Sequence, residues 1–139
     1  MSAENPMSDA RMPWEQLRRT GQEMGLLALK LYVISSKPVA GLGPILDLLE
    51  PHVAYQTQLE RDGVMFAAGP LANDDSSEWL GEGLFMYRAE SIDQAREIAQ
   101  ADPMHRNGAR EFTVREWMLN EGTCSVQVYF SADIKPRIS

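Results

Sequence analysis

Apolar and polar positions alternate along several short stretches of the chain, and a period of two residues predicts β-strands. Residues 27–36 are apolar on both faces of such a strand, so both faces should be covered. Residues 123–131 alternate cleanly, which indicates a fifth strand with one buried face. Apolar runs bounded by glycine, proline or polar residues predict further strands at 64–71, 83–89 and 110–119.

Two other stretches show the period of an amphipathic helix. Pro13 suits the first position of an N-terminal helix, and Gly25 follows the end of its apolar stripe. The next helix is expected to run to about Asp62, because Gly63 is suited to the position after a helix. Pro51 interrupts its pattern, so this helix either begins at Pro51 or is kinked there.

A third helix is expected over residues 91–100. Ser91 and Gln94 have the spacing of a capping box at its start. Asp102 continues the apolar stripe at the other end, and Pro103 is expected to stop the helix.

The order of elements is a helix, then strand–helix–strand–strand–helix–strand, then one more strand. The middle six predict the ferredoxin-like βαββαβ arrangement of the α+β class. We expect this domain over residues 29–119, after an N-terminal extension at 1–28 and before a C-terminal strand and tail at 120–139. Because the crossovers are right-handed, the two helices run antiparallel on one face of the sheet. The start of the first helix and the end of the second then lie at the same end of the domain.

The other face of the sheet is also predicted to be apolar, although no helix of the βαββαβ arrangement covers it. A second copy of the sheet is the simplest cover, which predicts a homodimer. The N-terminal helix is the alternative cover for part of this face.

The overall composition narrows the function classes. The 139 residues suit one domain, and the formal net charge of −7 disfavours nucleic acid and anionic membranes as partners. No apolar run has the length of a membrane span, and the N-terminus lacks the pattern of a secretory signal. The single cysteine, Cys124, fits a reducing compartment, so a cytoplasmic protein is expected. Cys124 alternates with valines and is predicted to be a buried small residue.

His52 is one of two histidines in the chain and lies on the apolar stripe of the second helix, beside leucines. It is either a core histidine with satisfied ring nitrogens or a general base oriented by Asp102, which the topology brings to the same end of the domain. Asp102 has an ordinary alternative as well, because aspartate before proline is common turn chemistry at a helix end.

The other candidate contacts are cationic groups that follow the third helix. His105 is expected to be a surface residue of a loop at the rim of the site. The alternative joins His105 to Arg106 and Arg110 as a cationic group that receives a carboxylate or phenolate substrate. Two histidines and one cysteine without metal-ligand spacing predict no metal site.

Four further residues are candidate substrate contacts that have a structural interpretation too. Gly69 and Pro70 are expected to shape a strand end and allow close approach to its backbone. Tyr55 is suited to the core or the site, and so is Arg115, which shares a strand face with Trp117.

Three blocks of this sequence resemble the YCII family of YciI-like proteins, in the dimeric α+β barrel group. They are PHVAYQTQLERDGVMFAAGPL (51–71), SIDQAREIAQADP (91–103) and the strand end REWML (115–119). The family pattern is a histidine early in the first helix, a G-x-x-x-x-x-G-P strand and an Asp-Pro after the second helix. His52, Gly63 to Pro70, and Asp102–Pro103 match it here.

By this resemblance, His52 and Asp102 take the places of an acid–base pair proposed for the family. Some relatives act in the breakdown of aromatic compounds, including dehydrochlorination of a chlorinated hydroxyquinol. The expected function is therefore a small cofactor-free enzyme that uses the His–Asp pair on a small, anionic cyclic metabolite, by elimination, isomerisation or lactone chemistry. The alternative is a non-catalytic module that binds a small molecule, or serves a partner enzyme, through the same cleft. A cofactor-free monooxygenase, known in the wider barrel group, ranks third.

Overall fold

The computed structural model of the chain describes residues 10–131 and 135–139. In chain order its elements are α1 (Trp14–Glu23), β1 (Leu29–Pro38), α2 (Gly43–Asp47), α3 (Leu49–Arg61), β2 (Met65–Pro70), β3 (Gly83–Tyr87), α4 (Ile92–Gln100), α5 (Pro103–Arg106), β4 (Arg110–Leu119), β5 (Val126–Gln127) and β6 (Arg137–Ile138). They divide between two compact units. One is Lys30–Met118, and the other is formed by the described residues of Met1–Leu29 and Leu119–Ser139.

The larger unit contains a four-stranded sheet with the strand order β2-β3-β1-β4. Strand β3 is antiparallel to both of its neighbours, β1 and β2. With its connecting helices, this is the predicted α+β, ferredoxin-like βαββαβ arrangement. The prediction of β4 at 110–119 matches the observed bounds.

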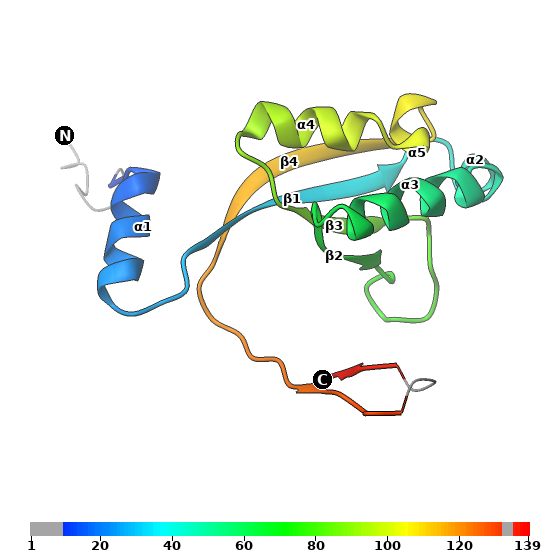
Figure 1. Cartoon of the computed structure of the whole chain (residues 1–139). Coiled ribbons are helices and arrows are strands. Elements are labelled where there is room, and N and C mark those ends of the chain that lie inside the picture. The colour runs from blue at the N-terminus through cyan, green and yellow to red at the C-terminus, as the bar shows by residue number, and fades with distance from the viewer. Residues whose placement is uncertain (1–9, 132–134) are drawn as a thin grey trace, which may run out of the picture. The chain divides into compact units, whose positions relative to one another are not determined.

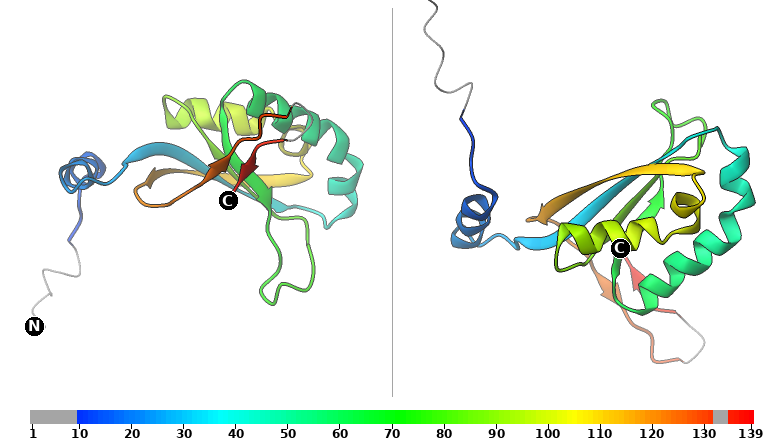
Figure 2. Two further views of the ribbon diagram at one scale, coloured as in Figure 1. Left: turned by 60° about the horizontal axis from the view of Figure 1, so that its bottom comes forward. Right: turned by 90° about the horizontal axis from the view of Figure 1, so that it is seen from above.

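Helices α3 and α4 lie on one face of this sheet and run antiparallel, as the views in Figures 1 and 2 show. The register pairs Tyr32 with Tyr87 and Ile34 with Phe85, so these side chains share the face that the helices cover. They form the main core together with Leu59, Ala95 and Ala99. The start of α3 and the end of α4 meet at one end of the domain, as the topology predicts.

The helix predicted before Gly63 is two helices, α2 and α3, which are separated at Leu48. Pro51 explains the break. In a continuous helix its ring would clash with the carbonyl of Asp47, four residues earlier, and it has no N–H to donate to that carbonyl. In the first turn of α3 the missing N–H is no loss, since first-turn donors lack helical acceptors. The helix thus begins at Leu49, two residues before Pro51, and Gly63 follows it at a φ of 76° as predicted.

Helix α4 has the predicted N-terminal cap. The Ser91 hydroxyl accepts a hydrogen bond from the Gln94 backbone N–H at 3.1 Å. The Gln94 side chain reaches back to the backbone N–H of Glu90 at 2.6 Å, one residue earlier than in a standard capping box.

The smaller unit differs from the sequence expectation. The predicted strand 123–131 is only Val126–Gln127, and it pairs with β6 of the same chain in a two-stranded sheet. The expected buried face is not formed, because Val126 is 61% exposed and Cys124 is exposed as well. Alternation marks a strand with one apolar face, but only a packing partner buries that face. Cys124 is therefore not the buried small residue that the pattern predicted.

Helix α1 follows Pro13, which takes the N-cap position just before the helix. Among the residues described here, no helix is both long and apolar enough to cross a membrane.

Candidate active site

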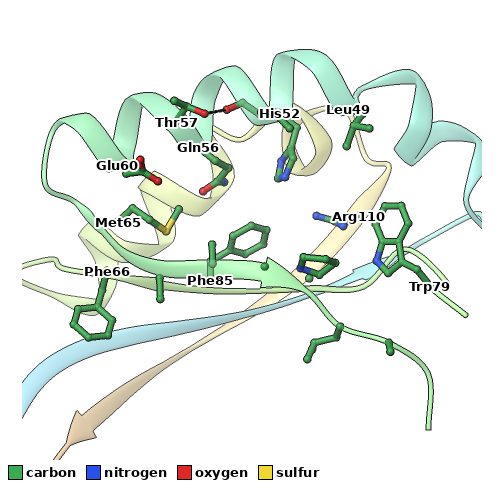
Figure 3. Close-up of a pocket in the computed structure, with 18 of the residues that line it drawn as sticks. Leu49, His52, Gln56, Thr57, Glu60, Met65, Phe66, Trp79, Phe85 and Arg110 are labelled. Carbon is green, nitrogen blue, oxygen red and sulfur yellow. Dashed lines mark hydrogen bonds between the residues drawn. The ribbon is translucent and has the colours of Figure 1, made fainter. Parts of the chain in front are cut away.

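His52 lies in the first turn of α3 and is 9% exposed. Its backbone N–H donates to the carbonyl of Leu48 at 3.0 Å, which anchors it where the helix begins. The break caused by Pro51 thus sets the position from which the His52 ring projects. Figure 3 shows this ring pointing from α3 toward the sheet side of a pocket.

Asp102 lies between α4 and α5 and is completely buried. It is the N-cap of α5, because its Oδ1 accepts a hydrogen bond from the Met104 backbone N–H at 2.9 Å. Pro103 therefore begins a new short helix, although the sequence suggested only the end of the preceding one. The aspartate has its ordinary helix-end role through Oδ1, and Oδ2 remains available for other contacts.

The predicted juxtaposition of His52 and Asp102 is present. His52 Nδ1 lies 2.7 Å from Asp102 Oδ2, although the residues are 50 positions apart in the chain. A carboxylate only accepts, so Nδ1 carries the hydrogen. Nε2 bonds to no side chain or backbone group in the described chain, and His52 lines the pocket. The free nitrogen is the one that can exchange a proton with a bound molecule.

Gln56 lies one helical turn after His52 and also binds the Asp102 carboxylate. Its side-chain amide donates to Asp102 Oδ2 at 2.5 Å and accepts from the Tyr87 hydroxyl at 3.0 Å. Gln56 is not among the site residues predicted from the sequence. Its spacing of four residues from His52 was the available signal, because residues at i and i+4 share a helix face.

The protonation state of Asp102 follows from these contacts. Burial alone would raise its pKa, but hydrogen bonding and charge from His52, the Met104 N–H and the Gln56 amide together hold the pKa below its ordinary value. Burial raises the pKa of Tyr87 and keeps its hydroxyl neutral. Asp102 is thus a carboxylate near neutral pH, and its hydrogen bond keeps the proton of the His52 ring on Nδ1.

His105 is not the surface loop residue that the sequence suggested. It lies in α5, is 5% exposed, and has aromatic neighbours in Phe85 and Phe112. Nδ1 donates to the Ala99 carbonyl and Nε2 accepts from the Ser36 hydroxyl, each at 2.6 Å. Burial lowers its pKa, so His105 is neutral and is not a cationic substrate contact.

A pocket of about 970 Å³ lies between α3, β2, β3 and the segment 71–79. Figure 3 shows His52 and Gln56 on the helix side, with Phe85, Trp79 and Arg110 opposite. Its walls are largely apolar, which suits a small organic molecule.

The candidate substrate contacts predicted from the sequence lie in three places: the pocket, the core and the exposed surface. Gly69, Pro70 and Arg110 line the pocket. Tyr55 belongs to the core, where its hydroxyl donates to the Ile98 carbonyl at 2.6 Å. Two cations predicted as contacts are exposed and do not line the pocket, namely Arg106 and Arg115.

The lining residues that were not predicted include Phe85, Trp79 and Gly83. Phe85 alternates with other apolar residues of its strand, so the sequence offers no signal that separates it from the core. Within residues 10–131 and 135–139, no group of three or more histidine, cysteine or acidic side chains is arranged to hold a metal ion.

The fold and the buried histidine–aspartate pair define a small α+β domain with a candidate acid–base site. The profile of the YCII-related domain family matches residues 31–118, and the chain belongs to this family.

Two relatives illustrate the match. The uncharacterized protein YjpA of Bacillus subtilis is 29% identical over 96 residues, which is 69% of this chain and 94% of that protein. A solved structure, the 5-chloro-2-hydroxyhydroquinone dehydrochlorinase TftG of Burkholderia phenoliruptrix in complex with 2,5-dihydroxybenzoquinone, is similar with a TM-score of 0.50 and 20% identity. That match covers 63% of this chain and 92% of TftG, and it supports the fold.

Proposed function

We propose that this protein is a small cofactor-free enzyme that uses His52 as a general base, oriented by Asp102, on a small cyclic compound. The observation that carries the proposal is the 2.7 Å hydrogen bond between His52 Nδ1 and the fully buried Asp102 carboxylate, beside a pocket. A buried carboxylate is costly unless it is fully hydrogen-bonded. Its retention at a pocket favours a functional role.

The chemistry follows from the free nitrogen. His52 Nε2 removes a proton from a carbon or oxygen of the substrate, and the Asp102 carboxylate stabilises the imidazolium that forms. In an elimination, the electrons of the broken C–H bond form a double bond, and the leaving group departs with its bonding pair. In an isomerisation, His52 returns the proton to a different atom. For a lactone, the same base activates the attacking oxygen.

The similarity to TftG favours elimination among these classes. TftG is named as a dehydrochlorinase of a hydroxyhydroquinone. A reaction of this kind on an aromatic or quinoid ring fits the size and the apolar walls of the pocket in this chain.

The test is turnover of chlorinated hydroxyhydroquinones, unsaturated lactones and cyclic hydroxy acids, followed by absorbance and product analysis. On a compound that is turned over, His52→Ala and Asp102→Asn should each lower kcat by about 10²–10⁴. Gln58→Ala, on an exposed position of the same helix, is the control and should retain the rate. Full activity in both site variants would refute the proposal.

A result without turnover distinguishes the alternative function. Compounds that raise the melting temperature but are not converted indicate a binding or accessory module that uses the same pocket.

We also propose that the chain forms a homodimer through the sheet face opposite α3 and α4. Val33 pairs with Met86 on that face, and Ser35 pairs with Leu84. The side chains of Val33, Leu84 and Met86 are only partly buried within one chain. A two-fold partner that packs on this face would remove them from water.

A further inference from the structure

Arg110 is a buried cation with an unused donor. It is the first residue of β4 and is 5% exposed, and its Nε donates to the Gly81 carbonyl at 2.9 Å. Its Nη1 is buried and has no hydrogen-bond partner in the described part of the chain. A buried N–H without an acceptor costs folding free energy, more so on a charged group. The unused donor therefore indicates an acceptor that comes from outside the chain.

Gly83 lets the Arg110 guanidinium pack directly against its backbone. A Cβ at Gly83 would lie 3.3 Å from Arg110 Nη1, 3.3 Å from Phe85 Cζ and 3.4 Å from Arg110 Nη2, so an added methyl group would press on the guanidinium. The backbone of Gly83 is outside the left-handed region, so its conformation does not require glycine. The close approach of Arg110 explains the glycine better. Gly83 and Pro70, its partner across the sheet, both line the pocket, so the guanidinium is held at the pocket wall.

Arg110 forms no ion pair with a carboxylate among the described residues. The charge of the buried Asp102 acts on it only through space, without a hydrogen bond between them. Glu60 and Glu78 line the same pocket, and Figure 3 places Glu60 beside Met65, away from Arg110, which lies beside Trp79. The Arg110 guanidinium is therefore a cation at the pocket wall without a directly paired carboxylate in this part of the chain.

We propose that Arg110, packed against Gly83 at the pocket wall, binds an oxyanion attached to a planar ring, so that the substrate is a ring carboxylate or a ring-bound oxyanion. Charge-assisted hydrogen bonds from a guanidinium recognise such oxygens. Phe85, Trp79 and Pro70 supply apolar surface for the ring. This inference deepens the proposed function and rests on it for the placement of the reacting atom near His52.

The experiment compares binding of charged and neutral ring compounds by calorimetry and melting temperature. Benzoate is paired with benzamide, and 4-nitrophenolate with 4-nitroanisole, which separates a carboxylate from a ring-bound oxyanion. The wild-type protein should bind at least one anion about tenfold or more tightly than its neutral partner. Arg110→Gln should abolish this preference, and Gly83→Ala should weaken it because the added methyl group would displace the Arg110 guanidinium.

Two further variants make the result specific. Arg115→Gln removes an exposed arginine from the same strand and should leave the preference unchanged. Gln58→Ala, at an exposed position of α3 outside the pocket, should also retain the anion preference.

The failures of the two proposals are distinguishable. Equal binding of charged and neutral compounds by the wild-type protein, no binding of any of the four, or a full preference in folded Gly83→Ala and Arg110→Gln would overturn the oxyanion contact. Loss of the preference together with His52-dependent turnover would refute this inference alone. A preference that depends on Arg110, without turnover of any compound, would refute only the catalytic role of His52.

Discussion

The hydroxyl oxygen of Ser36 lies 2.6 Å from Nε2 of His105, and the other ring nitrogen of His105 bonds to a backbone carbonyl. Both nitrogens are used within the core, and the ring is locked as one neutral tautomer. His52 differs in one respect, since only its Nδ1 has a partner in the described chain and the ring lines a pocket. The two histidines therefore have separate environments, which suit His105 to a role in stability and His52 to the proposed contact with a ligand.

The stability of the protein should decrease in mild acid because of His105. Burial holds the pKa of His105 below its ordinary value of 6.5, so the folded state binds fewer protons than the unfolded state below that pH. The contribution of neutral His105 to the free energy of unfolding is complete above pH 6.5. It is lost as the pH falls, by at most about 1.4 kcal/mol per pH unit. Urea unfolding at about pH 7.5 and about pH 5.5 measures the difference.

His105→Gln provides the comparison for this prediction. The glutamine does not titrate, so the free energy of unfolding of the variant should change less between the two pH values. An unchanged slope in the variant would mean that another group causes the acid sensitivity. Asp102 is not that group, because its pKa is lowered from 3.8 and it stays ionised throughout this range.

The two roles of Asp102 should separate in two variants. Asp102→Asn keeps an oxygen that can cap α5, since asparagine is a good N-cap, but it removes the charge that faces His52. Asp102→Ala removes the cap and leaves the His52 N–H and the Gln56 amide without their acceptor, which should cost about 2–4 kcal/mol of unfolding free energy.

Chemical denaturation and kinetics of both variants check this separation. Asp102→Asn should lose most of its activity and be clearly more stable than Asp102→Ala. Equal stability of the two would contradict the helix-capping role of Oδ1.

Gln56 should be a positioning residue that acts through Asp102. Gln56→Ala removes the hydrogen bonds to Asp102 and Tyr87, and the loss of one neutral and one charge-assisted bond should cost about 1–3 kcal/mol. The pKa of Asp102 should rise, because the Gln56 amide is one of the groups that lower it. Gln58→Ala removes only an exposed contact with Asp62 and is the matched control.

Carboxyl chemical shifts during an NMR pH titration measure the Asp102 pKa in both variants. A pKa that is the same in wild type, Gln56→Ala and Gln58→Ala would show that Gln56 is only a packing residue. A shift confined to Gln56→Ala supports the positioning role, which activity alone would not distinguish.

The sequence predicted the features that depend on local pattern and chain order. A bounded apolar run located β4 correctly, and the order of elements predicted that His52 and Asp102 lie together. The wrong predictions, for His105 and Cys124, came from sequence patterns that are compatible with two different structures. An Asp-Pro pair ends one helix and also begins another, so His105 was placed in a loop when it lies in α5. Alternation around Cys124 required a cover that one chain does not supply in the described residues.

Two features of the site were not available to sequence reasoning. Whether Arg110 has a partner depends on groups that reach it from distant parts of the chain, and a lone arginine at a strand start carries no such information. The close contact between Gly83 and the Arg110 guanidinium likewise exists only when β3 and β4 are in place. Both depend on tertiary packing rather than on periodicity or propensity.

The proposed dimer yields the final prediction. Met86→Glu places a charge on the open sheet face beside Val33 and should convert a dimer into a monomer, because burying an unpaired carboxylate there costs several kcal/mol. Ile92→Glu is the control, since Ile92 is exposed at the start of α4, on the helical side of the sheet. Sedimentation or light scattering across a concentration series reports the mass. A monomeric wild-type protein, or a Met86→Glu variant that remains dimeric, would contradict assembly through this face.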